Sequence, residues 1–363
     1  MIRLNNFVKE QSSYKKDLLS EIEAVIDSGW YILGDRVTKF ENNFAVFNDA
    51  KYCIGVANGL EALQIALMAC DIKEGDEVIT TPLSAFATTL AIINSKAIPV
   101  FVDIDKDTLN INSSQIEERI NSKTKAIMPV HLYGNPCEIK KIKNICSKHN
   151  LHLIEDACQA HGAQFDSKAI GTFGDIGCFS FYPTKNLGAI GDGGAIITNN
   201  ENFARLSKSL RDYGQTEKYK HQYLGLNSRL DELQAAILSV KLKHLTANLK
   251  KRAAIAKNYR KNIRNSKIEF VRELDSANGA NHLFVILTSN RDELKKYLLA
   301  NNILSDIHYP IGIHCQPAFK NNNFSGIFLP VCAEMVHKVL SIPIHPSLED
   351  NEIEYIVDTL NKF

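Results

Sequence analysis

The sequence predicts an α/β fold with a large domain built on a mostly parallel sheet of seven strands, followed by a small α+β domain. Through the first two thirds of the chain, short apolar runs alternate with helical patterns, which is typical of a parallel sheet covered by helices. The length of 363 residues also exceeds the usual size of one hydrophobic core. We therefore expect a large domain over residues 1–245 and a small domain over residues 246–363.

The strands of the large domain are predicted from their apolar runs. They lie at Tyr52–Val56, Glu77–Thr81, Ile98–Val102, Ala126–His131, His152–Glu155, Gly177–Phe181 and Gly194–Thr198. Helices that link or follow them are expected at about Leu60–Cys70, Ala85–Asn94, Cys137–His149 and Phe203–Tyr213. Ligands of open parallel sheets bind at the carboxyl ends of the strands, so the chemistry should lie along one edge.

A long helical pattern from Arg229 to about Arg264 is apolar at first and then increasingly basic, as expected of a connector out of the large domain. The small domain after it should contain strands at Lys267–Val271 and Leu283–Leu287 and helices at Asp292–Ala300 and Asp350–Leu360. The Asn-rich stretch Lys320–Ser325 is expected to form a surface loop.

Charge and composition exclude several classes of partner. The 42 Lys and Arg residues balance 41 Asp and Glu residues, so neither a nucleic acid nor a membrane surface is an expected partner. No apolar stretch approaches a membrane span and the N-terminus does not resemble a signal peptide, which predicts a cytoplasmic protein. The eight cysteines form no Cys-x-x-Cys pair and are expected to be reduced core residues, and no metal site is expected.

Lys185 is the most informative single residue. It follows a short apolar strand that is broken at Pro183, and it precedes a glycine-rich turn. An amine held at such a point can form a Schiff base with a carbonyl compound, which is how proteins hold pyridoxal 5'-phosphate (PLP). A lone lysine in a loop would ordinarily be a surface residue, so this interpretation depends on the residues around it.

Asp156 supports the same chemistry, because it ends an apolar strand where a ligand of a parallel sheet would lie. PLP requires an acid beside its ring nitrogen, since a carboxylate keeps that nitrogen protonated and the protonated ring withdraws electrons. The alternative is an Asp that caps a following helix.

The stretch Gly55-Val-Ala-Asn-Gly-Leu-Glu-Ala-Leu63 predicts a strand, a tight turn at Gly59 and the start of a helix. Backbone N–H groups converge at a helix start, so this turn is a candidate anion site, although it is equally the form of an ordinary strand-to-helix connection. Ser180 lies on the strand that leads to Lys185 and can offer a hydroxyl to the same anion, or it is a small buried polar residue bonded to backbone.

Seven segments in the same order along the chain resemble the DegT-type sugar aminotransferases, a family of fold-type I PLP enzymes. They are Ser28-Gly-Trp-Tyr-Ile-Leu-Gly34, Gly55-Val-Ala-Asn-Gly-Leu-Glu-Ala-Leu63, Thr81-Pro-Leu-Ser-Ala-Phe-Ala-Thr88, Glu155-Asp-Ala-Cys-Gln-Ala-His-Gly162, Phe179-Ser-Phe-Tyr-Pro-Thr-Lys-Asn-Leu187, Gly225-Leu-Asn-Ser-Arg-Leu-Asp-Glu-Leu-Gln-Ala-Ala236 and His308-Tyr-Pro-Ile-Gly-Ile-His314. The resemblance covers essentially the whole chain. It implies a PLP enzyme that transfers an amino group from L-glutamate to a nucleotide-linked keto-sugar, in a homodimer with shared active sites.

The resemblance also implies roles at the cofactor. The backbone at Gly59 and Leu60, together with Ser180, would bind the phosphate. Relatives commonly carry Thr where this chain has Leu60, so a side-chain hydroxyl is absent there.

Three further contacts with the cofactor are implied. Phe86 would stack on the pyridine ring, with core packing as the alternative. Gln159 would reach the phenolic oxygen. Asn227 would cross the dimer interface to the partner's phosphate, and it is also placed to cap the helix that follows.

The residues implied for the sugar nucleotide come from three parts of the chain. They are Tyr31, Leu33, Tyr182, His308, Tyr309 and His314. A single histidine is more often structural than functional, which applies to His314 in particular, and His161 is left out of the catalytic set.

The implied reaction has two halves. Glutamate displaces Lys185 from the cofactor, the freed amine carries the proton between Cα and the cofactor carbon, and the keto-sugar then takes the amino group by the reverse steps. The sequences of the Asn58 turn and of Gly188-Ala-Ile-Gly-Asp-Gly-Gly-Ala195 are most similar to the branch of the family that acts at C3 of dTDP-3-keto-6-deoxyhexoses. That branch makes dTDP-3-amino-3,6-dideoxy-glucose or -galactose.

Three alternatives remain at this stage. A C4 aminotransferase would act on dTDP- or UDP-4-keto-6-deoxy sugars. A sugar dehydratase of this fold has histidine in place of the lysine, so Lys185 argues against it. A non-enzymatic PLP-binding regulator is expected to lose some of Lys185, Asp156 and Gln159, and all three are present.

Overall fold

The computed structural model describes residues 1–319 and 327–363, so the predicted Lys320–Ser325 loop lies outside the described residues. Its main sheet has seven strands in the order β1-β9-β8-β5-β4-β2-β3. The strands are β1 (Tyr52–Val56), β2 (Glu77–Thr80), β3 (Ile98–Phe101), β4 (Thr124–Ile127), β5 (His152–Asp156), β8 (Ile176–Ser180) and β9 (Gly194–Thr198). Only β9 in this sheet runs antiparallel to its neighbours, which confirms the predicted mostly parallel α/β sheet.

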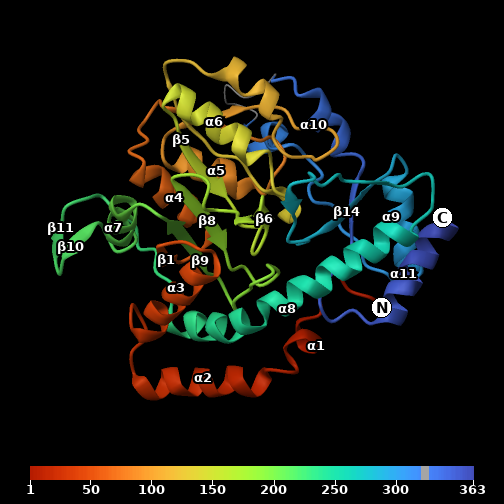
Figure 1. Ribbon diagram of the computed structural model, residues 1–363, viewed down its shortest axis with the longest axis horizontal. Helices are drawn as coiled ribbons and strands as arrows, with labels where there is room; N and C mark the ends of the chain where they lie inside the picture. Colours follow the sequence, from red (N-terminus) through yellow and green to blue (C-terminus); the bar gives the residue numbers. More distant parts are fainter. Residues whose placement is uncertain (320–326) are drawn as a thin grey trace.

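Helices cover both faces of this sheet (Figure 1). One face packs against α4 (Gly59–Ala69), α5 (Phe86–Asn94) and α7 (Glu201–Leu210), and the other against α3 (Asp35–Phe47), α6 (Ile139–His149) and α8 (Glu232–Asn262). Successive side chains of a strand point to opposite faces, so Leu153 joins the second layer while Ile154 joins the first. Both faces are apolar because both are buried.

The parallel strands bring their carboxyl ends to one edge. β5 pairs with β8 in a register that sets Asp156 beside Cys178, so Asp156 ends β5 near the point where Ser180 ends β8. The turn into α4 follows β1 at the same edge, because β1 and β8 run in the same direction on either side of β9. The topology therefore collects the predicted cofactor residues at this edge.

The α8 helix leaves the large sheet and crosses the molecule toward a second sheet (Figure 1). This sheet contains β12 (Glu269–Phe270), β14 (Phe284–Leu287) and β15 (Val339–Ile342) in antiparallel order, and it packs with α9 (Arg291–Ala300) and α11 (Asp350–Lys362). The proposed division between residues 245 and 246 falls inside α8, and it stays a proposal.

Several elements were not predicted from the sequence. They are α1 (Phe7–Gln11), α2 (Lys15–Ser28), α3, α10 (Pro330–Met335), β15, the hairpin of β10 (Gln215–Glu217) and β11 (Lys220–His221), and a small sheet of β13 (Ala277–Asn278), β6 (Gln164–Phe165) and β7 (Lys168–Ala169). Short 3-10 turns lie at η1 (Ser113–Gln115), η2 (Glu117–Arg119), η3 (Leu132–Gly134), η4 (Ile313–Cys315) and η5 (Pro317–Phe319). Tyr14 and Leu18 pack α2 against α8 in a separate small core.

Among residues 1–319 and 327–363, no helix combines the length and the apolar character of a bilayer span. All eight cysteines are free, as expected, and six of them are buried. Cys158 is half-buried and Cys315 is exposed, so these two are not core residues.

Candidate active site

A cavity of about 590 Å³ lies between the carboxyl edge of the large sheet and loop residues of the C-terminal part of the chain, just before β14 and between α9 and β15. It is lined by Leu4, Asn5, Asn58, Gly59, Leu60, Leu63, Ser84, Ala85, Ala87, Thr88, Asp156, Cys158, Gln159, Ser180, Tyr182, Thr184, Lys185, Asp192, His282, Leu283, Asp306, His308 and Tyr309. Lys185, Asp156, Gly59, Leu60, Gln159 and Ser180 thus meet in one cavity, as their positions along the sequence predict.

Lys185 lies in the loop between β8 and β9. Its backbone N–H donates to the Tyr182 carbonyl at 2.8 Å, and the turn closes so tightly that a Cβ on Gly188 would lie 2.3 Å from the Pro183 carbonyl oxygen. Burial lowers the pKa of the Lys185 amine, while nearby Cys158 and Asp156 oppose that shift. A lowered pKa raises the share of neutral, nucleophilic amine.

Asp156 is 4% exposed and has fixed hydrogen bonds. Its Oδ2 accepts from Thr88 Oγ1 at 2.8 Å, and its Oδ1 accepts from the backbone N–H of Cys158 at 3.2 Å. Residues 157–163 form turns instead of a helix, so Asp156 does not cap one. A buried carboxylate with remaining acceptor capacity suits a ring N–H in the cavity.

The orientation of the Gln159 amide follows from its neighbours. Gln159 Oε1 accepts from the Tyr133 backbone N–H at 2.7 Å, which leaves Nε2 to donate to the Tyr309 hydroxyl at 3.3 Å. Burial raises the pKa of Tyr309 to about 12, so its hydroxyl keeps its proton. Gln159 and Tyr309 therefore present hydrogen-bond donors at the cavity.

The part of the cavity lined by the start of α4 suits an anion. Asn58 caps α4 by accepting from the Glu61 N–H at 2.9 Å, and within the described residues the N–H groups of Gly59 and Leu60 donate no hydrogen bond. A Cβ on Gly59 would lie 2.6 Å from Cβ of Ser180, so only glycine allows this approach. Two free N–H groups at a helix start and the Ser180 hydroxyl fit a phosphate.

The predicted substrate residues divide into two groups. Tyr182, His308 and Tyr309 line the cavity, and His308 Nδ1 is bonded to Ser341 Oγ at 2.9 Å, which leaves Nε2 for a ligand. Burial lowers the pKa of His308 and so favours the neutral ring.

Tyr31, Leu33 and His314 do not line the cavity of their own chain. Tyr31 is 55% exposed, Leu33 packs against the core of the large domain, and His314 is buried with its ring 6.1 Å from that of Phe101. The roles predicted for these three residues stay predictions.

Two predicted cofactor residues also lie outside the cavity lining. Phe86 begins α5, and its ring centroid is 5.6 Å from that of Phe319. Asn227 is exposed and bridges to Asp212. An exposed Asn227 is free to meet a second chain, and the roles of both residues stay predictions.

Sequence reasoning missed Ser84, Thr88, His282 and Asn5, which all line the cavity. Thr88 lies two residues after Phe86 in a segment that resembles the family, so the sequence did contain a signal that Thr88 lies near the site. His282 gave none, because a histidine before an apolar strand has no distinctive pattern. Burial lowers the pKa of His282 well below its usual value, and the positive charge of Lys185 lowers it further, so the ring is neutral.

His161 was left outside the catalytic set. It is fully buried beside Phe44, Phe179 and Phe181, and within the described residues neither ring nitrogen has a hydrogen-bond partner. Burial lowers its pKa to about 3.

Comparisons with known proteins agree with this geometry. Residues 12–361 match the model of the DegT/DnrJ/EryC1/StrS aminotransferase family. The chain is 45% identical to the dTDP-3-amino-3,6-dideoxy-alpha-D-galactopyranose transaminase of Aneurinibacillus thermoaerophilus, over 96% of both chains. It is 40% identical to a protein of Geobacillus stearothermophilus named pleiotropic regulatory protein, over 98% of this chain and 96% of that one.

Among solved structures, DesV of S. venezuelae in complex with a ketimine intermediate superposes with a TM-score of 0.97 at 36% identity, covering 99% of this chain and 98% of DesV.

The family match and this fold show a PLP-dependent aminotransferase, with PLP as its cofactor, and its cavity contains a lysine and a buried carboxylate. The chain belongs to the DegT/DnrJ/EryC1/StrS aminotransferase family, and it is a sugar aminotransferase.

Proposed function

We propose that this enzyme transfers the amino group of L-glutamate to a dTDP-3-keto-6-deoxyhexose and so makes a dTDP-3-amino-3,6-dideoxyhexose. The observation that carries this proposal is the 45% identity with the Aneurinibacillus thermoaerophilus transaminase over 96% of both chains, whose name states a 3-amino-3,6-dideoxy sugar linked to dTDP. We also keep the prediction that the enzyme works in the cytoplasm.

The geometry of the cavity supports the proposed cofactor site. Lys185 holds PLP covalently, the Gly59 and Leu60 N–H groups and Ser180 bind its phosphate, and Asp156 meets its ring nitrogen. When bound, PLP withdraws electrons from the carbon that loses its proton. Gln159 donates to the phenolic oxygen from an amide that Tyr133 has already oriented.

Lys185 has a second proposed role as the group that moves the proton. With PLP bound, its amine would take a proton from the α-carbon of glutamate and return it on the cofactor side. A general base works best when its pKa is near the working pH, and burial lowers the pKa of Lys185 in that direction. In the second half-reaction the same amine delivers the proton to the sugar carbon.

The charges along the cavity support a site shared between two chains. Lys185 is the only Lys or Arg among the described lining residues, whereas Asp156, Asp192 and Asp306 are acidic. A nucleotide diphosphate and the carboxylates of glutamate need cations or N–H donors. We propose that a second copy of the chain supplies some of them.

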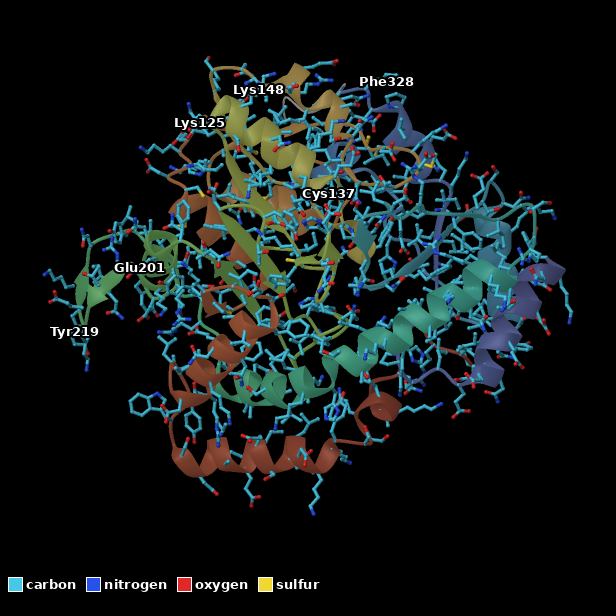
Figure 2. All side chains as sticks on the ribbon, in the orientation of Figure 1. Lys125, Cys137, Lys148, Glu201, Tyr219 and Phe328 are labelled. Carbon is cyan, nitrogen blue, oxygen red and sulfur yellow. The ribbon has the colours of Figure 1, made fainter. Side chains whose placement is uncertain are left out.

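Large apolar side chains outside the cavity support a homodimer. Tyr219 is 83% exposed and Leu224 is 93% exposed, on or just after the β10–β11 hairpin, and Trp30 is 63% exposed near the start of α3. Figure 2 shows Tyr219 at the end of this hairpin, away from the body of the chain. Such side chains on a projecting hairpin are suited to contact with a partner.

Incubation of the enzyme with L-glutamate and a panel of keto-sugar nucleotides tests the substrate directly. The panel contains the gluco and galacto forms of dTDP-3-keto-6-deoxyhexose, together with dTDP- and UDP-4-keto-6-deoxy sugars, and NMR locates the new amino group. We expect amination at C3 of a dTDP sugar. Amination at C4 would support the alternative, and no product from any 3-keto sugar would contradict the proposal.

The name of the Geobacillus stearothermophilus relative raises a separate question about regulation. A protein that only binds the cofactor would show no change in its absorption spectrum when glutamate is added. We expect glutamate alone to convert the bound cofactor in a single turnover. This result separates a catalytic protein from a regulator without any sugar substrate.

A further inference from the structure

Two hydroxyl groups connect the start of α5 to Asp156. Thr88 Oγ1 lies 2.8 Å from Asp156 Oδ2, and Ser84 Oγ lies 2.9 Å from Thr88 Oγ1. Ser84 is 4% exposed, Thr88 is 1% exposed and Asp156 is 4% exposed, and all three line the cavity. A buried hydroxyl pair on a buried carboxylate is therefore part of the wall of the proposed cofactor site.

The chemistry of the groups fixes the direction of this chain. An ionised carboxylate only accepts hydrogen bonds, so Thr88 must donate its single hydroxyl proton to Asp156. The Thr88 oxygen is then left as an acceptor, and the proton between the two hydroxyls must come from Ser84. The order is Ser84 to Thr88 to Asp156, and each donation polarises the next.

The backbone completes the support of the carboxylate. The Cys158 N–H donates to Asp156 Oδ1, so Thr88 and Cys158 hold different oxygens of the same group. These two bonds use about half of the four lone-pair positions of a carboxylate, which leaves acceptors for a group in the cavity. Two fixed donors also prevent rotation of the side chain about its last bond.

We propose that Ser84 and Thr88 are positioning residues that hold the Asp156 carboxylate in the correct orientation toward the ring nitrogen of the cofactor. This inference rests on the proposed role of Asp156 as the partner of that nitrogen. Neither hydroxyl touches the reacting atoms. Their effect passes through the carboxylate, so removing them should weaken only the recognition of the ring nitrogen.

The neighbouring Thr89 provides a matched control. It is also fully buried on α5, and its Oγ1 has no hydrogen-bond partner among the residues that the structure describes. Thr89→Val makes the same change of a hydroxyl to a methyl group one residue away. It measures what the loss of a buried hydroxyl does when Asp156 is not involved.

The test compares two ligands of the full-length enzyme freed of cofactor, by isothermal titration calorimetry. One ligand is pyridoxamine 5'-phosphate, and the other is its analogue with C–H in place of the ring nitrogen. We expect Thr88→Val to weaken pyridoxamine 5'-phosphate about ten-fold, as for loss of one hydrogen bond to a charged group, and to leave the analogue within about two-fold. Thr88→Ser and Thr89→Val should bind both ligands like the wild type.

Two further variants make the outcomes distinct. Ser84→Ala should show the same selective pattern with a smaller loss of about three-fold, since it is one bond further away, and it replaces Thr88→Val if that variant does not fold. Asp156→Asn should lose the preference for the ring nitrogen. If Asp156→Asn loses this preference while Thr88→Val and Ser84→Ala keep it, the proposed role of the two hydroxyls is wrong and the role of Asp156 stands.

Equal weakening of both ligands in Thr88→Val would show a packing effect and overturn the inference. A preference for the ring nitrogen that persists in Asp156→Asn would overturn the proposed role of Asp156 together with the inference.

Discussion

The two ends of the cavity differ in how completely this one chain forms them. At the large-domain end, Asp156, Gln159 and Thr88 are buried and hydrogen-bonded to one another or to backbone. At the outer end, Tyr182 lines the cavity and is 52% exposed, and Tyr31, a second predicted substrate residue, lies outside the lining and is 55% exposed. The chain thus fixes the groups for the chemistry and leaves much of the proposed substrate surface open.

This difference follows from the fold. Asp156 and Ser180 end strands of one packed sheet and Gly59 begins a helix that covers it, so packing and register allow these residues little freedom. The outer residues lie in loops, which lie at the surface and are free to meet other molecules. The open surface leaves room for a second chain, as the proposed shared site requires.

Lys185→Ala should have the largest effect and tests the large-domain end. Turnover should be lost, because the amine both holds the cofactor and carries the proton, while pyridoxamine 5'-phosphate should still bind at the phosphate and ring sites. Absorption spectra and the glutamate half-reaction measure these two properties. Normal turnover in this variant would end the proposed mechanism.

Asp156→Asn should leave the fold intact and slow the glutamate half-reaction steeply, by about a hundred-fold or more. The loss of about 3 kcal/mol that this represents is the upper value for one hydrogen bond to a charged group, and the weaker electron withdrawal adds to it. Stopped-flow spectra give the rate. A rate within a few-fold of the wild type would remove Asp156 from the site.

Tyr182→Phe addresses the outer end of the cavity. If its hydroxyl contacts the sugar nucleotide, KM for the keto-sugar should rise about five- to ten-fold, the effect of one lost hydrogen bond, with the glutamate half-reaction unchanged. Tyr355→Phe is the control, because Tyr355 is a partly exposed tyrosine on α11. An equal loss in both half-reactions would place Tyr182 at the cofactor instead.

His161 is buried in the large domain and allows a smaller test, which follows the stability of the protein as a function of pH. Burial holds its pKa at about 3 in the folded protein, below the ordinary value of 6.5, so the unfolded chain binds more protons between these values. This group's contribution to stability is complete above pH 6.5 and is lost as the pH falls.

The wild type should therefore lose this contribution to stability as the pH falls, and His161→Phe should not. The free energy of unfolding of His161→Phe minus that of the wild type should increase by about 1.4 kcal/mol from pH 7.5 to pH 5.5. Urea unfolding at the two pH values gives this difference, and exposed His337→Phe is the control. A difference that does not change with pH would mean that His161 binds its proton over the same pH range in the folded protein as in the unfolded chain.

The same contrast explains what the sequence could predict. The predicted strands of the main sheet are confirmed, because apolar runs are local signals, and Lys185 and Asp156 line the same cavity. The helix α2 was missed because it is stabilised by packing on α8, far away in the sequence. Propensity alone rarely reveals a helix of this kind.

A cavity residue next to the second sheet was missed for a related reason. His282 reaches the cavity because its backbone N–H pairs with the Tyr133 carbonyl at 3.0 Å and Arg252 holds the adjacent carbonyls. These contacts join segments that are distant in the sequence, and no local pattern encodes them. The short β10–β11 hairpin likewise has too few residues for a periodic signal.

The most direct test of a site shared by two chains is a mixed dimer of Lys185→Ala with Asn227→Glu, each inactive alone. If Asn227 serves the partner's cofactor, one site of the mixed dimer has both native residues and the other has neither. Activity should then recover to about one quarter of the wild type, because random mixing makes about half of the dimers mixed and each has one intact site. No recovery from a dimer shown to be mixed would mean that Asn227 serves its own chain, and it would contradict the shared site.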